Sequence, residues 1–203
     1  PHIVQLCDVL NDMGAQIEGV ETHELTIHGV NSLNPIEVKI IPDMIEAGTF
    51  LMAGAILGNI TLNNASPDHL SIVLQKLEQA GCTIYVDDDT ISIEKADNLE
   101  AVDMMTDVYP SFPTDLQAQW IAIMSVASGT SVITDTIYHD RFSHVPELVR
   151  LGANISMENN MAIVRGVDKL RGAQVMSTDI RASASLVIAA LMAKGKSTIS
   201  RVY

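Results

Sequence analysis

Three aspartates occupy the same position in a stretch that recurs along the chain. Asp43, Asp115 and Asp179 are 72 and 64 residues apart. Each ends a short extended run and precedes a helical pattern of small residues, a glycine and a strand pattern. The stretches read Ile41-Pro42-Asp43-Met44, Phe112-Pro113-Thr114-Asp115 and Met176-Ser177-Thr178-Asp179. A carboxylate at such a corner can cap the helix, or it can bind a substrate or accept its proton. Capping is favoured for Asp43, the Thr-Asp context favours a site for Asp115, and both roles are open for Asp179.

Two arginines near these corners also have two interpretations. Arg181 lies one turn into the helical pattern after Asp179, where it could neutralise that carboxylate or bind an anionic group. Arg141 follows Asp140, and an exposed ion pair of this kind contributes at most about 1 kcal/mol. The residues alone do not decide whether either arginine pairs with its neighbouring aspartate or binds a ligand.

No metal site or cofactor is predicted. His139 and His144 are five residues apart, which does not place two ligands on one helix face, and no third ligand accompanies them. The run Asp87-Asp88-Asp89 is expected to be a hairpin turn, because it lacks the alternating acidic pattern of a calcium loop.

The composition limits the classes of partner. The net charge is −13 and the pI is about 4.6, which argues against nucleic acid or an anionic membrane surface. Two cysteines, Cys7 and Cys82, are too few for a disulfide framework and favour a reducing, cytoplasmic location. No apolar run is long enough to span a membrane, and no signal peptide is recognised. The chain begins without Met inside a helical pattern, so we expect it to be a piece of a longer protein.

A second sequence pattern alternates along the chain with the stretch that contains the aspartates. A helical pattern ends at Gly14, Gly81 or Gly152, and a strand hairpin pattern follows each glycine. The aspartate stretch and this helix–glycine–hairpin pattern together predict a unit of strand, helix, strand, helix, strand, strand. Whole units are expected at about 37–96 and 101–167, with half units at 1–30 and 173–203. The small residues along the helices predict helices packed inside an α/β fold with sheets around them.

These phrases resemble the enolpyruvyl transferases, and within that family the branch that acts on UDP-N-acetylglucosamine. The matching residues are Phe112 to Gln119, Arg141 to Leu148 with Gly152-Ala153, Gly172 to Val175, Thr178 to Ser185, and Pro42-Asp43 with Ile45 to Thr49. The resemblance implies an inside-out α/β prism built from repeated βαβαββ units. It also implies that residues 1–39 end a first domain, that residues 40–203 form most of a second, and that the chain is the C-terminal portion of the enzyme.

The resemblance further implies a reaction and its residues. The enolpyruvyl group of phosphoenolpyruvate would pass to the 3-hydroxyl of UDP-N-acetylglucosamine, the first committed step of peptidoglycan synthesis. Asp115 would bind that hydroxyl and act as its base. Thr114, Ile137 and Arg141 would lie near the sugar nucleotide, and Asp179 and Arg181 near the reacting centre.

Some residues of the family pattern are absent from the chain. Met44 stands where an arginine is expected, and His2 where an acidic residue is expected. The family's catalytic lysine and its fosfomycin-reactive cysteine are expected outside this chain, because neither Cys7 nor Cys82 lies in a glycine-rich loop. We therefore expect the chain alone to be inactive and to require the N-terminal domain of the same enzyme.

Two other functions remain open. One is the branch of the family that acts on shikimate 3-phosphate, and the other is a binding or scaffold module that keeps the fold without the chemistry. The complementary half units at the two ends also allow a further arrangement, in which residues 1–30 dock on residues 173–203 and close a three-unit domain.

Overall fold

The computed structural model describes residues 1–202 and divides them into two compact units. The first unit is Pro1–Pro42 and the second begins at Asp43. The expected boundary at residue 39 between two domains of the enzyme stays a prediction.

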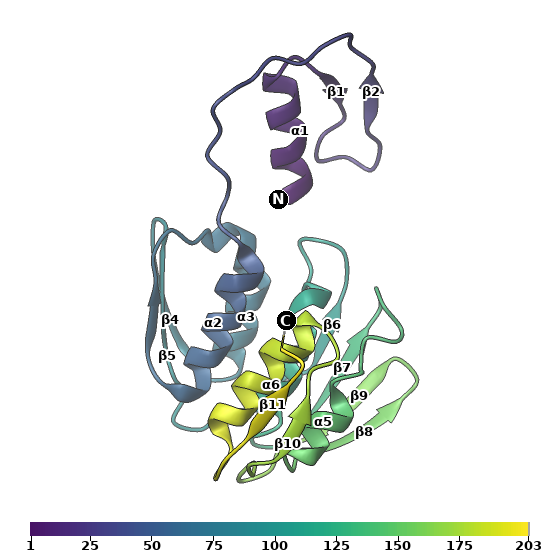
Figure 1. The fold of residues 1–203 in the computed structure, drawn as a ribbon. Helices are drawn as coiled ribbons and strands as arrows, with labels where there is room; N and C mark the ends of the chain where they lie inside the picture. The colour runs from purple at the N-terminus through teal and green to yellow at the C-terminus, as the bar shows by residue number, and fades with distance from the viewer. Residues whose placement is uncertain (203) are drawn as a thin grey trace. The chain divides into compact units, whose positions relative to one another are not determined.

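The first unit is a helix followed by a hairpin (Figure 1). Helix α1 (His2–Asp12) ends before Gly14, whose φ of 104° is one that glycine adopts without strain. Strands β1 (Gln16–Glu18) and β2 (Thr26–His28) pair antiparallel. The Asn11 side chain holds the helix to the hairpin, since it donates to the Ile17 carbonyl at 2.9 Å and accepts from the Ile17 amide at 2.8 Å.

The strand expected at the start of the 37–96 unit is not formed, so that prediction is wrong. Residues 29–43 contain no helix or strand. The Gln5 side chain donates to the Lys39 carbonyl at 3.0 Å and accepts from the Ile41 amide at 3.2 Å. An extended segment needs a neighbouring strand to pair its amides and carbonyls, and here a side chain takes part of that role.

The second unit contains the repeats. The first comprises α2 (Met44–Leu57), β3 (Ile60–Leu62), α3 (Ser71–Gln79), β4 (Thr83–Asp87) and β5 (Thr90–Glu94), with a short 3-10 helix, η1 (Pro67–Leu70), before α3. The second comprises β6 (Met104–Thr106), the 3-10 helix η2 (Thr114–Leu116), α4 (Gln117–Met124), β7 (Thr130–Asp135), α5 (Val145–Arg150), β8 (Asn154–Glu158) and β9 (Met161–Arg165). The half unit comprises β10 (Gln174–Met176), α6 (Ile180–Met192) and β11 (Thr198–Ser200), and its last residue, Tyr203, lies outside the described residues. The element order expected for 101–167 is confirmed.

The sheets repeat the same pairing. The second repeat forms a sheet of order β6-β7-β9-β8, in which β6 and β7 are parallel and β8 and β9 form an antiparallel hairpin. The first repeat has the order β3-β5-β4, which is the same arrangement without its leading strand. In the half unit, β10 and β11 are parallel, as β6 and β7 are.

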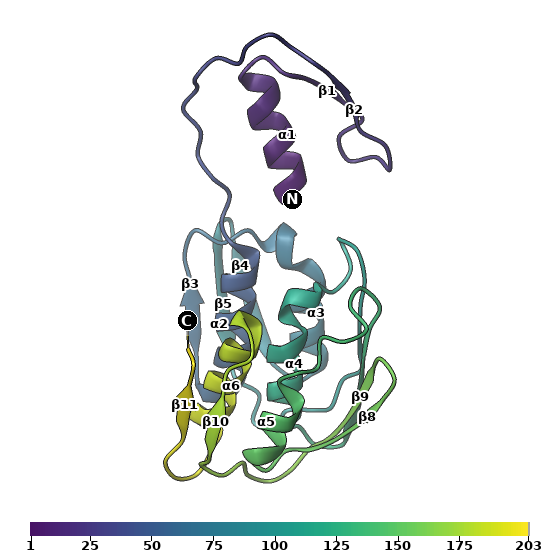
Figure 2. The ribbon, with the colours of Figure 1, turned by 45° about the vertical axis from the view of Figure 1, so that its right-hand side comes forward.

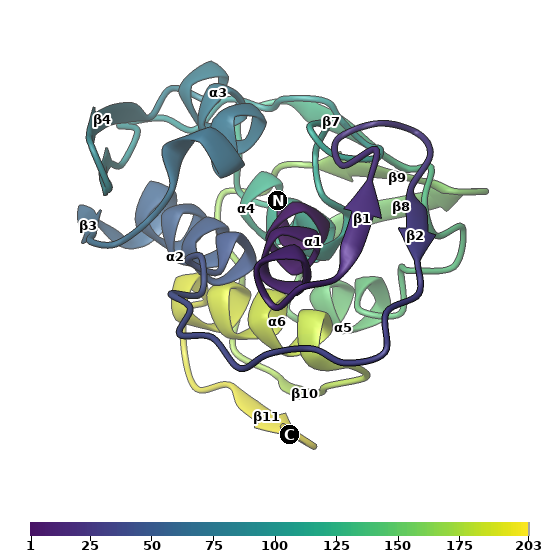
Figure 3. The same cartoon turned by 90° about the horizontal axis from the view of Figure 1, so that it is seen from above.

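Helices form the interior of the second unit, and the sheets lie outside them, as expected. Helices α2, α4 and α6 contact one another, and every residue of α4 is buried. Figures 2 and 3 show these helices surrounded by the β3–β5, β6–β9 and β10–β11 sheets. Gly48 allows the close approach, since a Cβ atom there would overlap the Leu116 side chain. The fold therefore brings α2 directly against η2, the turn that carries Asp115.

Candidate active site

The three equivalent aspartates have different roles in the structure. The Asp43 carboxylate caps α2 by accepting from the amides of Ile45 at 2.8 Å and Glu46 at 3.2 Å. The Asp179 carboxylate caps α6 in the same way, accepting from Arg181 at 2.8 Å and Ala182 at 3.0 Å. Asp115 lies inside η2 and caps no helix. Its carboxylate is therefore available for other partners.

Asp115 is bound by two arginines. Its Oδ1 atom accepts from Arg141 Nη1 at 3.0 Å and from Arg181 Nε. The Arg141 side chain is 17% exposed, and those of Asp115 and Arg181 are each 36% exposed. Within residues 1–202, Asp115 Oδ2 accepts no hydrogen bond. The arrangement is a partly solvated carboxylate that is oriented by cations through one oxygen and open at the other.

Arg141 is held in place from two sides. Its Nη1 atom also donates to Thr114 Oγ1 at 3.1 Å, and its guanidinium carbon lies 3.9 Å from the centre of the Tyr138 ring. A cation over an aromatic face is attracted to it, and the planar guanidinium suits both contacts at once. The surface pair with Asp140, which the sequence left open, is not formed.

The pocket beside these groups has a volume of about 280 Å³. It is lined by Tyr138, Asp140, Arg141, Ser143, Asp179 and Arg181. The loop after β7 and the first turn of α6 supply these residues. The pocket therefore joins two cations to two carboxylates at the surface of an otherwise acidic chain, which is where an anionic ligand can be bound locally.

A buried histidine, His144, follows Ser143, which lines the pocket. His144 is 2% exposed and stacks on Phe142, with ring centres 6.4 Å apart. Burial disfavours the imidazolium and lowers the pKa of His144 to about 4, although the Asp179 charge acts in the opposite direction. Near neutral pH this ring is therefore uncharged.

Asp179 keeps its charge. Burial raises the pKa of this carboxyl, but the amides of Ala182 and Arg181 outweigh burial. The charge of Arg181, and that of His144 when it is protonated, act in the same direction, so the pKa lies below its ordinary value of 3.8. The Ser143 hydroxyl lies 2.9 Å from that of Thr178 and 3.4 Å from the Asp179 carboxylate, which ties the loop to the start of α6.

Five of the six site residues expected from the sequence meet in one network. Arg141 and Arg181 bind Asp115, Thr114 binds Arg141, and Asp179 lines the same pocket. Ile137 is 37% exposed and does not line the pocket. Its amide donates to the buried carboxylate of Asp135, and the Thr114 hydroxyl donates to the same carboxylate.

Sequence reasoning missed that carboxylate, Asp135, and the ring of Tyr138. Asp135 is the last residue of β7, where burial alternates through Ser131, Ile133 and Asp135, but the sequence itself does not alternate between apolar and polar residues. An aspartate at the end of a strand was the available signal. Tyr138 lies in a polar loop, where nothing in the sequence distinguished it.

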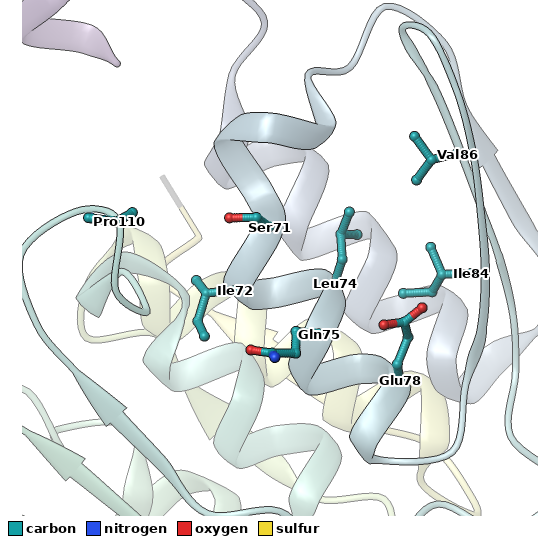
Figure 4. A pocket seen from close by; sticks show the side chains of 8 residues that line it. All are labelled: Ser71, Ile72, Leu74, Gln75, Glu78, Ile84, Val86 and Pro110. Atoms are coloured by element: carbon teal, nitrogen blue, oxygen red, sulfur yellow. The ribbon is translucent and has the colours of Figure 1, made fainter.

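A second, larger hollow lies on the other repeat. It has a volume of about 620 Å³ and lies between α3, β4 and the loop that contains Pro110 (Figure 4). Its lining includes Leu74, Ile84, Val86 and Glu78 as its charged residue. It contains none of the expected site residues and no pair of charges, so the smaller pocket is the candidate active site.

Residues 1–202 contain neither a membrane-spanning helix nor a cluster of metal-binding side chains. No helix there is both long and apolar enough to cross a membrane. No group of three or more His, Cys, Asp or Glu side chains in this range is arranged to hold a metal ion.

The chain is similar over its whole length to proteins of one family. The family model described as EPSP synthase (3-phosphoshikimate 1-carboxyvinyltransferase) matches residues 1–203. The UDP-N-acetylglucosamine 1-carboxyvinyltransferase of Desulfosudis oleivorans is 54% identical over all of this chain, and the protein of that name from Chlorobium luteolum is 52% identical.

Solved structures give the same result. The enolpyruvyl transferase NikO from Streptomyces tendae matches 99% of this chain with a TM-score of 0.88 and 28% identity. An EPSP synthase from Acinetobacter baumannii matches 94% of the chain with a TM-score of 0.71 and 20% identity, which shows the shared fold.

The chain spans about half the length of these relatives. It covers 49% and 48% of the two curated relatives and 49% of the NikO chain. The family model that matches residues 1–203 shows the family, but these matches do not confirm that the chain is the C-terminal portion.

Proposed function

The chain belongs to the EPSP synthase family, and from that premise we propose that it is part of an enolpyruvyl transferase acting on UDP-N-acetylglucosamine. The enzyme would transfer the enolpyruvyl group of phosphoenolpyruvate to the 3-hydroxyl of the sugar and release phosphate, a step of peptidoglycan synthesis. The names of the curated relatives, 54% and 52% identical to this chain, support this choice of substrate.

The observation that carries the chemistry is the position of Asp115 between Arg141 and Arg181. A sugar hydroxyl is weakly acidic, so its attack on the enolpyruvyl carbon needs a positioned proton acceptor. Asp115 Oδ1 is occupied by the two guanidinium groups, and Oδ2 is open to the hydroxyl. Over the reaction as a whole, the carbon–oxygen bond to the sugar forms and the bond from the same carbon to the phosphate oxygen breaks. Asp115 accepts the hydroxyl proton, which leaves with the released phosphate.

The arginines supply positive charge for anionic substrates. Arg141, with Thr114 and the loop at Ile137, would contact the sugar nucleotide. Arg181 would face the phosphate or the carboxylate of phosphoenolpyruvate, and Asp179 would hold the first turn of α6 that carries it. The pairing of both arginines with Asp115 keeps them extended into the pocket before substrate binds.

Residues outside this chain would complete the site. A pocket of about 280 Å³ is smaller than the roughly 300–1,000 Å³ usual for sites that enclose a drug-sized ligand. We place the family's lysine and cysteine in the part of the enzyme that this chain lacks.

The test is phosphate release by the full-length gene product with phosphoenolpyruvate and either UDP-N-acetylglucosamine or shikimate 3-phosphate. Turnover is expected with the sugar nucleotide. Asp115→Asn should lower kcat by about 10²-fold or more, since it removes the proton acceptor and keeps the shape. The matched control is Asp43→Asn, which changes the equivalent aspartate in a helix cap and should leave kcat unchanged.

Two results would contradict the proposal. Turnover with shikimate 3-phosphate alone would assign the other branch of the family. Binding without turnover of either acceptor would assign a binding or scaffold module.

A further inference from the structure

Asp135 is a buried carboxylate that the proposed chemistry does not use. It is fully buried at the end of β7. Its Oδ1 atom accepts from Thr106 Oγ1 at 2.8 Å and from the amides of Ile137 at 3.0 Å and Tyr138 at 2.9 Å. Its Oδ2 atom accepts from Thr114 Oγ1 at 2.6 Å. An ionised carboxylate is costly to bury unless it is hydrogen-bonded, and these four donors meet that requirement.

The main chain of Asp135 is fixed as well as its side chain. Its amide donates to the Asn160 carbonyl at 3.0 Å, and its carbonyl accepts from the Asn160 side chain at 3.0 Å. Asn160 lies in the turn between β8 and β9. The carboxylate is therefore attached to the rigid sheet, which is a suitable support for a site built on loops.

The two oxygens of Asp135 hold different parts of the candidate active site. Oδ1 fixes the start of the loop that leads from Ile137 through Tyr138 to Arg141. Oδ2 fixes Thr114, the residue before Asp115. The loop and the η2 turn are separate along the chain, and this carboxylate joins them.

The direction of the hydrogen bonds matters. A carboxylate only accepts, so the Thr114 hydroxyl must donate its proton to Asp135. The hydroxyl oxygen then presents its lone pairs to Arg141 Nη1 at 3.1 Å, and this nitrogen also donates to Asp115 at 3.0 Å. Asp135 thus determines the orientation of Thr114, and Thr114 helps to determine that of Arg141.

We propose that Asp135 is a positioning residue for the sugar-nucleotide side of the site, acting through Thr114 and Arg141. This inference rests on the proposed function. Among residues 1–202, Asp135 forms no hydrogen bond or ion pair with Arg181, so its influence should be confined to one of the two substrates. A purely structural role, in which Asp135 only joins β6 to β7 through Thr106, predicts no such selectivity.

The experiment uses Asp135→Asn in the full-length gene product. Asparagine keeps the volume and one carbonyl oxygen for Thr106 and the two amides, but it places an NH₂ group against Thr114. The Thr114 hydroxyl then accepts from Asn and can no longer offer the same lone pair to Arg141. The KM for UDP-N-acetylglucosamine should rise about tenfold, the size expected for a hydrogen bond to a charged group. The KM for phosphoenolpyruvate should stay unchanged.

Two further variants separate positioning from stability. Thr106→Val removes the donor on the structural side, so it should lower the melting temperature and leave both KM values unchanged. Thr114→Val should raise the KM for the sugar nucleotide as Asp135→Asn does, and the double variant should be no worse than either alone. Non-additivity of this kind is expected when two residues act through one contact.

The outcomes distinguish this inference from the proposed function. If the unmodified enzyme does not use UDP-N-acetylglucosamine, the proposed function has failed. If it does, the inference is overturned by unchanged KM values in Asp135→Asn, by an equal rise for both substrates, or by fully additive effects of Asp135→Asn and Thr114→Val.

Discussion

At the scale of single residues, equivalent positions in the repeat have taken different roles. Asp43, Asp115 and Asp179 begin from one sequence pattern, and two of them cap helices as that pattern predicts. Asp115 differs because Arg141 and Arg181 reach it from 26 and 66 residues away. A local pattern identified the corner, but only the fold determines which distant side chains meet there.

The partners of the arginines show the same limit. From the sequence, Asp140 was the neighbour available to Arg141, and Asp179 was the neighbour available to Arg181. In the structure both side chains bind Asp115, while Arg181 meets Asp179 through its amide. Adjacency along the chain was a poor guide because the loop and the α6 turn face a common pocket.

His144 should make the stability of the fold depend on pH between about 6.5 and about 4. Its pKa is about 4 in the folded chain and 6.5 ordinarily, so the unfolded state binds the proton more tightly. The free energy of unfolding should therefore be highest above pH 6.5 and fall by about 3 kcal/mol as the pH decreases to 4. The lowered pKa of Asp179 adds a further loss only below about pH 3.8, which is a separate window.

The measurement is an NMR titration of His144 together with urea unfolding at several pH values. His144→Phe keeps a ring against Phe142 and should flatten the dependence between pH 6.5 and 4. His139→Gln, at an exposed position, is the control and should keep it. An NMR pKa for His144 near 6.5 would contradict the prediction.

At the scale of elements, the repeat was predictable because each part of it has a local cause. Helix-ending glycines, aspartate corners and alternating strands gave the order of elements in 101–167. The leading strand at 37–42 was wrongly expected because a strand also needs a neighbour, and the pattern does not contain that information. The structure shows another repeated contact, in which a helix side chain bonds the main chain of the segment before the next of the three aspartates. Gln5 bonds Lys39 and Ile41, Lys76 bonds Asp103, and Glu147 bonds Met176.

The contact of α2 with η2 gives a prediction at this scale. Gly48→Ala raises intrinsic helix propensity by about 1 kcal/mol, but the new methyl group would overlap the fully buried Leu116 side chain. Overpacking of this kind usually costs about 1–3 kcal/mol, so the variant should be less stable. Chemical denaturation of the 203-residue chain measures the change.

A compensating substitution tests the cause. Leu116→Ala should destabilise the chain when introduced alone, because it leaves a cavity. In the Gly48→Ala background it should cost less, because the added methyl group then fills part of the space. Equal costs in both backgrounds would show that the two residues are not in the expected contact.

At the scale of the whole molecule, the candidate active site gathers two cations on a strongly acidic chain. The chain has a net charge of −13, yet its candidate active site places Arg141 and Arg181 at one pocket. The net charge of the chain therefore does not describe the local charges at this pocket. Composition gave no indication of Asp135, because a buried carboxylate is recognised by its donors, and these come from β6, η2 and the loop after β7.

The same pocket predicts that the chain alone does not complete the reaction. About 280 Å³ cannot enclose a sugar nucleotide together with phosphoenolpyruvate, and the chain spans about half the length of its relatives. Water would reach the open side of the pocket and weaken each charged contact. We therefore expect the isolated 203-residue chain to fold, to bind UDP-N-acetylglucosamine weakly, and to release no phosphate from phosphoenolpyruvate.

The comparison needs the isolated chain and the full-length gene product in the same phosphate-release assay. Circular dichroism and dispersed NMR amide signals establish that the isolated chain is folded, so that an absence of product is informative. Weak binding that is lost in Asp115→Asn would show that this pocket already recognises the sugar nucleotide before the rest of the enzyme closes it. Product formation by the isolated chain at a rate near that of the full-length protein would contradict the prediction, because the described residues would then suffice for both binding and chemistry.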